Sequence, residues 1–219
     1  MTPAEYNKQT TILLGELMTD TGFSKKRICK LSRKAEECEQ HITFWFTRDR
    51  GLPGNLYSVN PKVGFTFKEV DKLTSRFLGI EYDAKWCTGI KPLYTVIPDK
   101  PSFGFVHRSD RFKYCSEEPL NQYAERVAED FRLYALPYFA KYDTLEKIEV
   151  YLEQNPIQGI GKGGFHVVRS QGLDGGRACC YVAVLCLLKK WDKLHMFVES
   201  TDLLFPDQKE RIIEYISNK

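Results

Sequence analysis

Hydrophobic and polar residues alternate almost without exception along residues 55–68. The apolar face of this segment consists of Tyr57, Val59, Val63, Phe65 and Phe67. A period of two is typical of a strand with one face on a core and the other in water. Such half-buried strands belong to antiparallel sheets, whereas the strands of parallel sheets are apolar on both faces. Pro61 lies inside the segment, so the strand needs an edge position or a bulge there.

Further strands are expected where β-branched and aromatic residues gather between turn signals. These segments are residues 27–33, 40–48, 91–98 and 102–107. In the strand expected at 40–48, alternation places Ile42, Phe44 and Phe46 on one face and Trp45 on the other. The face that carries Trp45 must be covered by a helix or form a binding surface.

An amphipathic helix is predicted at residues 3–19. Thr2 can cap it, and Glu5 can complete a capping box by reaching back to the cap. Gly22 supplies the left-handed residue that ends it. The apolar stripe of this helix is Tyr6, Leu13, Leu14 and Leu17.

Most of the later chain has helical periodicity. Helices are expected at residues 68–78, from about 117 until Pro137 ends or kinks the chain, and at 143–154, 177–191, 193–203 and 206–217. In the helix that begins near 117, Tyr123, Val127 and Phe131 face inward and Asp130 faces solvent. The segment 177–191 is apolar nearly all round, which indicates a buried helix.

These elements predict an α+β protein. An antiparallel sheet of about five strands is packed by the N-terminal and central helices, and a helical extension follows. We expect an α+β domain at residues 1–156, with the C-terminal helical extension, 157–219, packed on it because its apolar helix needs cover.

Composition and charge narrow the functional classes. The chain has 219 residues, of which 42% are hydrophobic and 28% charged, as in soluble globular proteins. Its 32 basic and 29 acidic residues leave a net charge of +3, less than a dedicated nucleic-acid binder usually carries. No apolar run is long enough to span a bilayer, and the N-terminus lacks the order of a signal peptide. The seven cysteines have no framework spacing, which favours reduced thiols and a cytoplasmic location.

Basic residues are concentrated near the start of the expected sheet. Residues 25–34 include Lys25, Lys26, Arg27, Lys30 and Arg33. As a nucleic-acid patch this run would need stacking aromatics beside it, and Phe23 alone is near. As a charged strand edge it would resist unwanted sheet pairing, or it could meet an acidic protein partner. We take these five cations together with Trp45 as the candidate interaction surface.

No motif carries clear catalytic chemistry. The glycines of residues 159–164 match a dinucleotide-binding spacing, but a helix precedes them and a strand-like FHVVR follows, the reverse of the required order. They are therefore interpreted as a connector. The histidines and cysteines lack metal-ligand spacing, and His107 with Cys115 is the least improbable nucleophile pair. We predict no catalytic residue, no metal and no cofactor.

Several short motifs resemble those of a known family. They are Gly22-Phe23 with Lys25-Lys26, a strand ending in Arg33, the pair Val59-Asn60, the sequence Leu136-Pro137-Tyr138-Phe139, and Asp143-Thr144-Leu145-Glu146. In this order they resemble the bacterial domain of unknown function 4304 family over about residues 5–154. The resemblance implies an α+β domain without an established activity.

Three functional hypotheses remain open. The first is a non-enzymatic cytoplasmic interaction protein of the immunity or accessory type, which rests on analogy of architecture. The second is a small-ligand binder or enzyme whose cleft lies between the sheet and the C-terminal helices. The third is nucleic-acid binding through residues 25–34. The sequence leaves the oligomeric state open.

Overall fold

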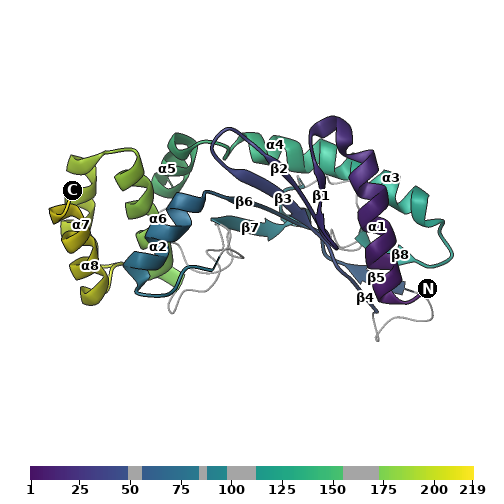
Figure 1. Ribbon diagram of the computed structural model, residues 1–219, viewed down its shortest axis with the longest axis horizontal. Coiled ribbons are helices and arrows are strands. Elements are labelled where there is room, and N and C mark those ends of the chain that lie inside the picture. The colour runs from purple at the N-terminus through teal and green to yellow at the C-terminus, as the bar shows by residue number, and fades with distance from the viewer. Residues whose placement is uncertain (49–55, 84–87, 98–111, 155–172) are drawn as a thin grey trace. The chain divides into compact units, whose positions relative to one another are not determined.

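The computed structural model describes residues 1–48, 56–83, 88–97, 112–154 and 173–219, and the statements below concern these residues (Figure 1). The chain forms two compact units. The first unit comprises Met1–Ala35, Glu39–Gly64 and Lys91–Lys141, and the second comprises Glu36–Cys38, Phe65–Ile90 and Tyr142–Lys219. The prediction of an α+β fold with a five-stranded antiparallel sheet is confirmed.

The larger sheet has the strand order β1-β2-β3-β6-β7. Its strands are β1 (Ser24–Arg27), β2 (Lys30–Lys34), β3 (Glu39–Thr43), β6 (Lys62–Thr66) and β7 (Gly89–Pro92). A smaller sheet in the first unit has the order β4-β5-β8, with strands β4 (Phe46–Arg48), β5 (Leu56–Val59) and β8 (Tyr114–Cys115). Since β1 ends the order of the larger sheet, it is an edge strand.

Three of the predicted strands are each divided in two. Residues 27–33 hold the turn between β1 and β2, residues 40–48 are divided between β3 and β4, and residues 55–68 between β5 and β6. The prediction of single strands was wrong because each segment contains a point where the backbone leaves the ladder. At Pro61, which has no N–H to donate, the carbonyl oxygen accepts a 2.8 Å hydrogen bond from the amide of Leu93 instead.

The strand expected at residues 91–98 is shorter than predicted. It is the end of β7, followed by a 3₁₀ turn at Leu93–Thr95. The strand expected at residues 102–107 lies outside the described residues.

The N-terminal helix α1 (Pro3–Leu17) begins as predicted. The amide of Glu5 donates to Thr2 Oγ1 at 3.3 Å, and the amide of Thr2 donates to the Glu5 carboxylate at 2.6 Å. Its buried face differs from the predicted stripe, since Leu13 and Leu17 are only half-buried. The buried residues are Tyr6, Asn7, Thr10, Thr11 and Leu14. Three of these are polar, and two of them, Asn7 and Thr11, make hydrogen bonds that the apolar stripe could not reveal.

Helix α3 (Leu120–Asp130) packs against α1 in the first unit (Figure 1). It continues through a π-helical turn, Phe131–Ala135, into the short helix α4 (Leu136–Ala140). Pro137 therefore does not end the helix. It lies directly after the π-helical turn, where the regular α-helical hydrogen-bond pattern is already interrupted. Asp130 was predicted to face solvent, but its side chain is fully buried.

The second unit is helical. It contains α2 (Lys68–Leu78), α5 (Leu145–Gln154), α6 (Leu173–Leu187), α7 (Trp191–Ser200) and α8 (Pro206–Ser217). Every residue from Ala178 to Leu185 in α6 is buried, as the all-round apolar sequence predicted. Helix α6 packs against α2, α5 and α7, and α8 packs against α2. Helix α6 is thus the centre of this unit.

An ion-pair network around one buried carboxylate joins α5 to the start of α7. The Glu149 side chain is 2% exposed and lies 2.5 Å from Lys190 Nζ and 2.8 Å from Lys193 Nζ. Lys193 Nζ also lies 2.9 Å from the Glu153 carboxylate. Burial acts to raise the pKa of Glu149, but the hydrogen bonds from the two lysines lower it below its usual value. The buried carboxylate of Glu149 thus has two cationic partners, as the burial of a charge requires.

None of the helices in the described part of the chain is long and apolar enough to cross a membrane.

Asp71 is a buried carboxyl in α2. It is 6% exposed, and its Oδ1 accepts a 2.8 Å hydrogen bond from Thr88 Oγ1, which in turn accepts one from the amide of Phe67 at 2.7 Å. Its Oδ2 has no hydrogen-bond partner. Burial raises the pKa of Asp71 to about 7, although the Thr88 hydrogen bond opposes this shift. The neutral form is therefore favoured in the fold.

The stability of the second unit should consequently depend on pH through Asp71. Because the folded-state pKa of about 7 lies above the unfolded value, this stabilisation is complete at low pH and is lost as pH rises toward 7. We expect the free energy of unfolding to fall by up to about 1.4 kcal/mol per pH unit in this interval. Asp71→Asn should remove the dependence and exceed the wild type in stability at pH 8, as measured by urea unfolding.

Glu210→Gln, at an exposed position on α8, is the matched control and should retain the wild-type pH profile. An unchanged stability difference between Asp71→Asn and the wild type across pH 5 to 8 would contradict the role of Asp71.

Candidate functional site

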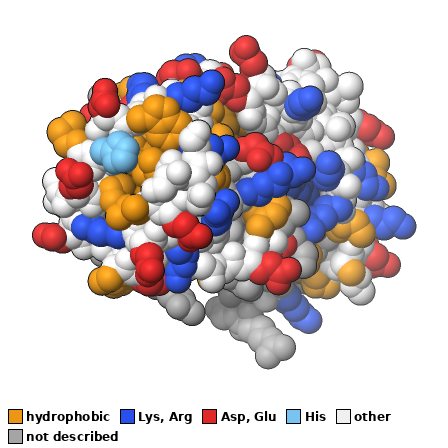
Figure 2. All heavy atoms as spheres, turned by 60° about the vertical axis from the view of Figure 1, so that its left-hand side comes forward, with side chains coloured by type: hydrophobic (Ala, Val, Ile, Leu, Met, Phe, Trp, Pro, Cys, Tyr) orange, Lys and Arg blue, Asp and Glu red, His pale blue; other side chains and the backbone are white. Residues whose placement is uncertain are grey.

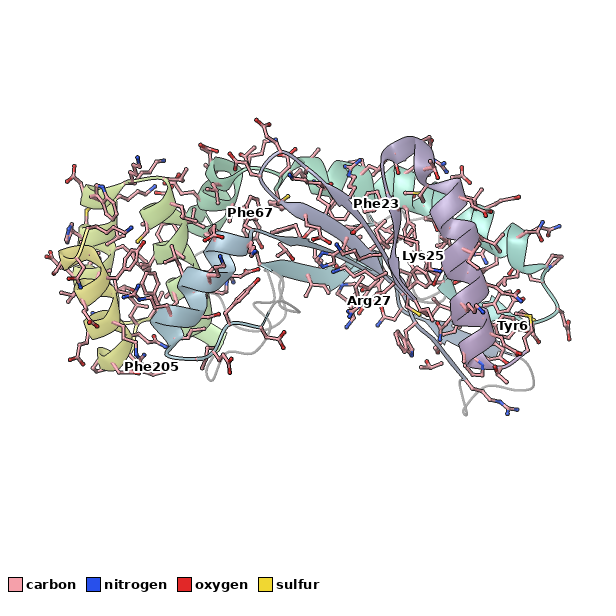
Figure 3. The ribbon with its side chains drawn as sticks, in the orientation of Figure 1. Tyr6, Phe23, Lys25, Arg27, Phe67 and Phe205 are labelled. Atoms are coloured by element: carbon pink, nitrogen blue, oxygen red, sulfur yellow. The ribbon has the colours of Figure 1, made fainter. Side chains whose placement is uncertain are left out.

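The hairpin of β1 and β2 carries the cations that the sequence singled out. Lys25 pairs with Leu31 and Arg27 pairs with Lys30, so the register shifts by one residue at Lys26. All four residues of β1 are exposed, and Lys25 and Arg27 lie along it in Figure 3. This irregularity is a bulge, which re-aims the side chains that follow it.

The bulge divides the basic run between two faces of the sheet. Directly paired residues share a face, and neighbours along a strand alternate. Lys25 therefore shares the face of Leu31, which is fully buried, whereas Arg27 shares the opposite face with Lys30. On the Lys25 side α1 approaches closely, since a Cβ added at Gly15 would lie 3.7 Å from Lys25 Cβ.

The turn between the strands, Ile28-Cys29, is anchored to α1. Cys29 adopts the left-handed conformation with φ 63°. Its amide donates a 2.9 Å hydrogen bond to Thr11 Oγ1, and the Thr11 hydroxyl donates to the Asn7 carbonyl at 2.6 Å. Thr11 is fully buried. A strained, non-glycine residue is thus held in place by a buried hydrogen bond.

Trp45 lies beside this turn on a backbone that is fixed on both sides. The amide of Phe44 donates to the Cys29 carbonyl at 3.1 Å, and the amide of Phe46 donates to Asn7 Oδ1 at 2.9 Å. The side chain of Trp45 is nevertheless 59% exposed, and that of Ile28 is 50% exposed. We call Arg27, Ile28, Lys30 and Trp45 the hairpin-tip surface.

Arg33 makes contacts that stabilise the fold, and it is not part of the hairpin-tip surface. Its Nε donates to Gln40 Oε1 at 2.8 Å, and its guanidinium donates to the Thr21 carbonyl at 2.8 Å. The same group lies 4.9 Å from the ring centre of Phe23, which is 1% exposed. The guanidinium thus donates hydrogen bonds from its edge and also contacts an aromatic ring. Of the six residues expected to form one surface, Lys25 lies on another face and Arg33 is tied to the core, while Lys26, at the bulge, is exposed.

The positive charges of Lys30 and Arg27 affect a buried histidine of the sheet. His41 on β3 is 1% exposed and pairs with Ser32 of β2. Burial, together with the charges of Lys30 and Arg27, lowers the pKa of His41 to about 3. His41 is therefore neutral near pH 7 and cannot serve there as a general acid.

The other candidate chemistry gains no support from the described residues. Burial raises the pKa of Cys29 to about 11 and those of Cys179, Cys180 and Cys186 to about 12, so these thiols are protonated near pH 7. No group of three or more metal-ligating side chains gathers within the described ranges. The glycine motif at 159–164 and His107 lie outside those ranges.

No protein-family model, curated protein or solved structure matches this chain. The resemblance to the domain of unknown function 4304 family thus rests on the sequence motifs given above.

Sequence reasoning missed three residues of the site: Asn7, Thr11 and Ile28. A signal for the first two exists, because Asn7 and Thr11 are four residues apart and fall on the same helical face as Tyr6 and Leu14. Polar residues on a buried face imply hydrogen bonds to something beyond the helix. Nothing in the local pattern distinguished Ile28 from a buried strand residue.

Thr11→Val should destabilise the protein by about 1–3 kcal/mol, because the amide of Cys29 would be left buried without its acceptor. Urea unfolding measures the loss, and faster hydrogen exchange at the Cys29 amide locates it. Thr19→Val is the matched control: Thr19 makes a similar 2.9 Å bond to Gly15 four residues earlier, but it is exposed. This control should cost less than about 0.5 kcal/mol. Equal losses in both variants would contradict the anchoring role of Thr11.

Proposed function

We propose that this chain is a non-enzymatic interaction module that binds an acidic protein partner through the hairpin-tip surface. The observation that carries the proposal is Trp45, whose side chain is 59% exposed on a backbone hydrogen-bonded at both neighbouring residues. Tryptophan is enriched among the residues that dominate binding energy. A side chain on a fixed backbone loses little further freedom when a partner covers it.

Charge complementarity supports an acidic partner. Arg27 and Lys30 share a face beside the turn, and Lys26 is exposed at the bulge next to them. The whole chain is nearly neutral at +3, so this concentration of charge is local. Such a surface accelerates encounter with an acidic partner and makes the association rate depend on salt.

A protein partner fits this surface better than a nucleic acid. Trp45 offers one stacking surface, but Phe23, the other aromatic residue beside the basic run, is buried under Arg33. The second exposed apolar group is the aliphatic side chain of Ile28, which offers no ring for base stacking. An aliphatic and an aromatic residue surrounded by cations suit a mixed protein surface.

The proposal is tested by affinity capture from an extract of the native cells, followed by affinity measurement with the enriched protein. Trp45→Ala should weaken binding by about 30-fold or more, as expected for a central aromatic anchor. Leu133→Ala, at another exposed apolar residue of the first unit (54% exposed), should have no effect. Arg27→Gln with Lys30→Gln should slow association and reduce its salt dependence, whereas Lys8→Gln with Lys62→Gln should not.

Two outcomes contradict this function. One is a partner whose affinity is the same for Trp45→Ala and for Leu133→Ala. The other is tight binding of single- or double-stranded DNA or RNA at physiological salt that Lys25→Ala, Lys26→Ala and Arg27→Ala together abolish, which would favour the nucleic-acid hypothesis.

We also propose that the protein works in the reducing cytoplasm. The support is that Cys29, Cys115, Cys179, Cys180 and Cys186 form no disulfide in the structure, while Cys87 lies outside the described residues. Disulfides are rare in that compartment. Thiol titration in denaturant, without reductant and with air excluded, should find close to the seven thiols of the sequence. Two or more blocked pairs would contradict the assignment.

A further inference from the structure

A cavity of about 310 Å³ lies inside the second unit, between α5, α6 and α7. Apolar and aromatic side chains form most of its lining: Leu152, Ala178, Tyr181, Met196, Phe197 and Leu203. The sequence suggested a cleft between the sheet and the C-terminal helices, but these residues come from α5, α6, α7 and the segment after α7. An apolar cavity of roughly 150 Å³ is large enough for benzene. A molecule of about two fused rings therefore matches the volume of this cavity.

The apolar wall of the cavity has a buried part and a part that is open to solvent. Leu152 is 7% exposed and Ala178 is 1% exposed, so the buried part is continuous with the core of the unit. Met196 is 64% exposed, and Phe197 and Leu203 are half-buried. Figure 2 shows hydrophobic side chains, in orange, lying among charged ones on one face of the molecule. A ligand that covers the open part removes apolar surface from water, which is the main source of affinity for an apolar molecule.

The lining also contains groups that make favourable contacts with aromatic rings. Tyr181 and Phe197 meet edge to face, with their ring centres 4.9 Å apart. Aromatic rings prefer edge-to-face or offset contacts with further rings. The thioether of Met196, which lines the same cavity, is of the kind that packs well at the edge of a ring. These groups favour an aromatic ligand over an aliphatic ligand of the same size.

The polar side chains of the lining already have partners inside the protein. Lys193 Nζ lies 2.8 Å from the Glu149 carboxylate and 2.9 Å from the Glu153 carboxylate. The Ser200 hydroxyl donates a 2.7 Å hydrogen bond to a backbone carbonyl one turn earlier in α7, and Arg177 has interactions of its own within the protein. A charged ligand must displace one of these contacts or remain without a counter-charge in the cavity. An uncharged ligand leaves all of them intact.

We propose that this cavity binds a small uncharged aromatic molecule of about two fused rings. The rings would lie against Tyr181, Phe197 and Met196, and the ion pairs of Lys193 would stay closed. The site belongs to the second unit, whereas the hairpin-tip surface belongs to the first. This inference therefore goes beyond the proposed interaction function and does not rest on it.

The first test compares three probes that share a naphthalene ring system: 2-naphthalenemethanol, 2-naphthoate and 2-naphthylmethylammonium. Each is titrated into the ¹⁵N-labelled full chain near pH 7, where the carboxylic acid and the amine are ionised, and amide shifts report the affinity. The uncharged alcohol should bind and shift amides of α6 and α7. Both ions should bind about tenfold more weakly or worse, because the lining offers neither of them an unused counter-charge.

A fourth probe tests the preference for an aromatic ligand. The decahydro analogue of 2-naphthalenemethanol has the same carbon skeleton and the same hydroxyl group, but its rings are saturated. It should bind more weakly than the aromatic alcohol, because it loses the ring-to-ring contacts with Tyr181 and Phe197.

A set of variants tests the location of the site at exposed positions, where the fold tolerates a change. Met196→Glu places a charge at the open side of the cavity and should weaken binding of the aromatic alcohol by about tenfold or more. Met196→Leu keeps this position apolar and should retain most of the affinity. Ile213→Glu makes the matched change on α8, at a residue that is 54% exposed and outside the lining, and should bind the alcohol as the wild type does.

Four results would overturn the proposal. They are the absence of binding of 2-naphthalenemethanol, an affinity for either ion that equals or exceeds that for the alcohol, equal affinities for the aromatic and the saturated alcohol, and equal weakening by Met196→Glu and Ile213→Glu.

Discussion

Two hydrogen bonds that side chains of α1 accept from backbone amides determine the course of the chain in the first unit. Asn7 Oδ1 accepts from the amide of Phe46, and Thr11 Oγ1 accepts from the amide of Cys29. The first holds the backbone where it passes from the larger sheet to the smaller one. The second holds the turn of the edge hairpin in a left-handed conformation. Both acceptors are buried, so their loss would leave amides unsatisfied in the core. The exposure of Trp45 and Ile28 is a consequence of this arrangement.

The helices could be predicted from the sequence because their signals are local. The bounds of α2 and α8 agree with the periodic pattern, and the Thr2–Glu5 capping box forms as expected. The strand breaks could not be predicted in the same way. The bonds that interrupt the segments are made by residues 18 and 39 positions away in sequence, which a period-two pattern does not register. The interruption at Pro61 was the exception. It could be predicted because proline cannot donate a backbone hydrogen bond to a neighbouring strand.

The candidate surface was only partly visible in the sequence. The cluster of lysine and arginine at residues 25–34 can be read directly from the sequence. Trp45 was recognised because the alternation along residues 40–48 places it on the opposite face from Phe44 and Phe46. The bulge at Lys26 and the ties of Arg33 to Gln40 and Thr21 depend on register and on distant partners. The bulge and the contacts of Arg33 determine which of the cations lie on the same face of the sheet.

The central position of α6 also affects how the protein is made. Helix α2 places Val70 and Phe77, both fully buried, in the same unit as α6, yet α6 begins only at Leu173. Roughly 95 residues separate the two helices, which corresponds to about 5–20 s of synthesis on a ribosome. During that interval the apolar face of α2 lacks the helix against which it packs. The first unit can fold as its own segments emerge, whereas the second is completed only after α6, α7 and α8 have been synthesised. Helix α2 is therefore a segment at which the nascent chain can aggregate or bind a chaperone.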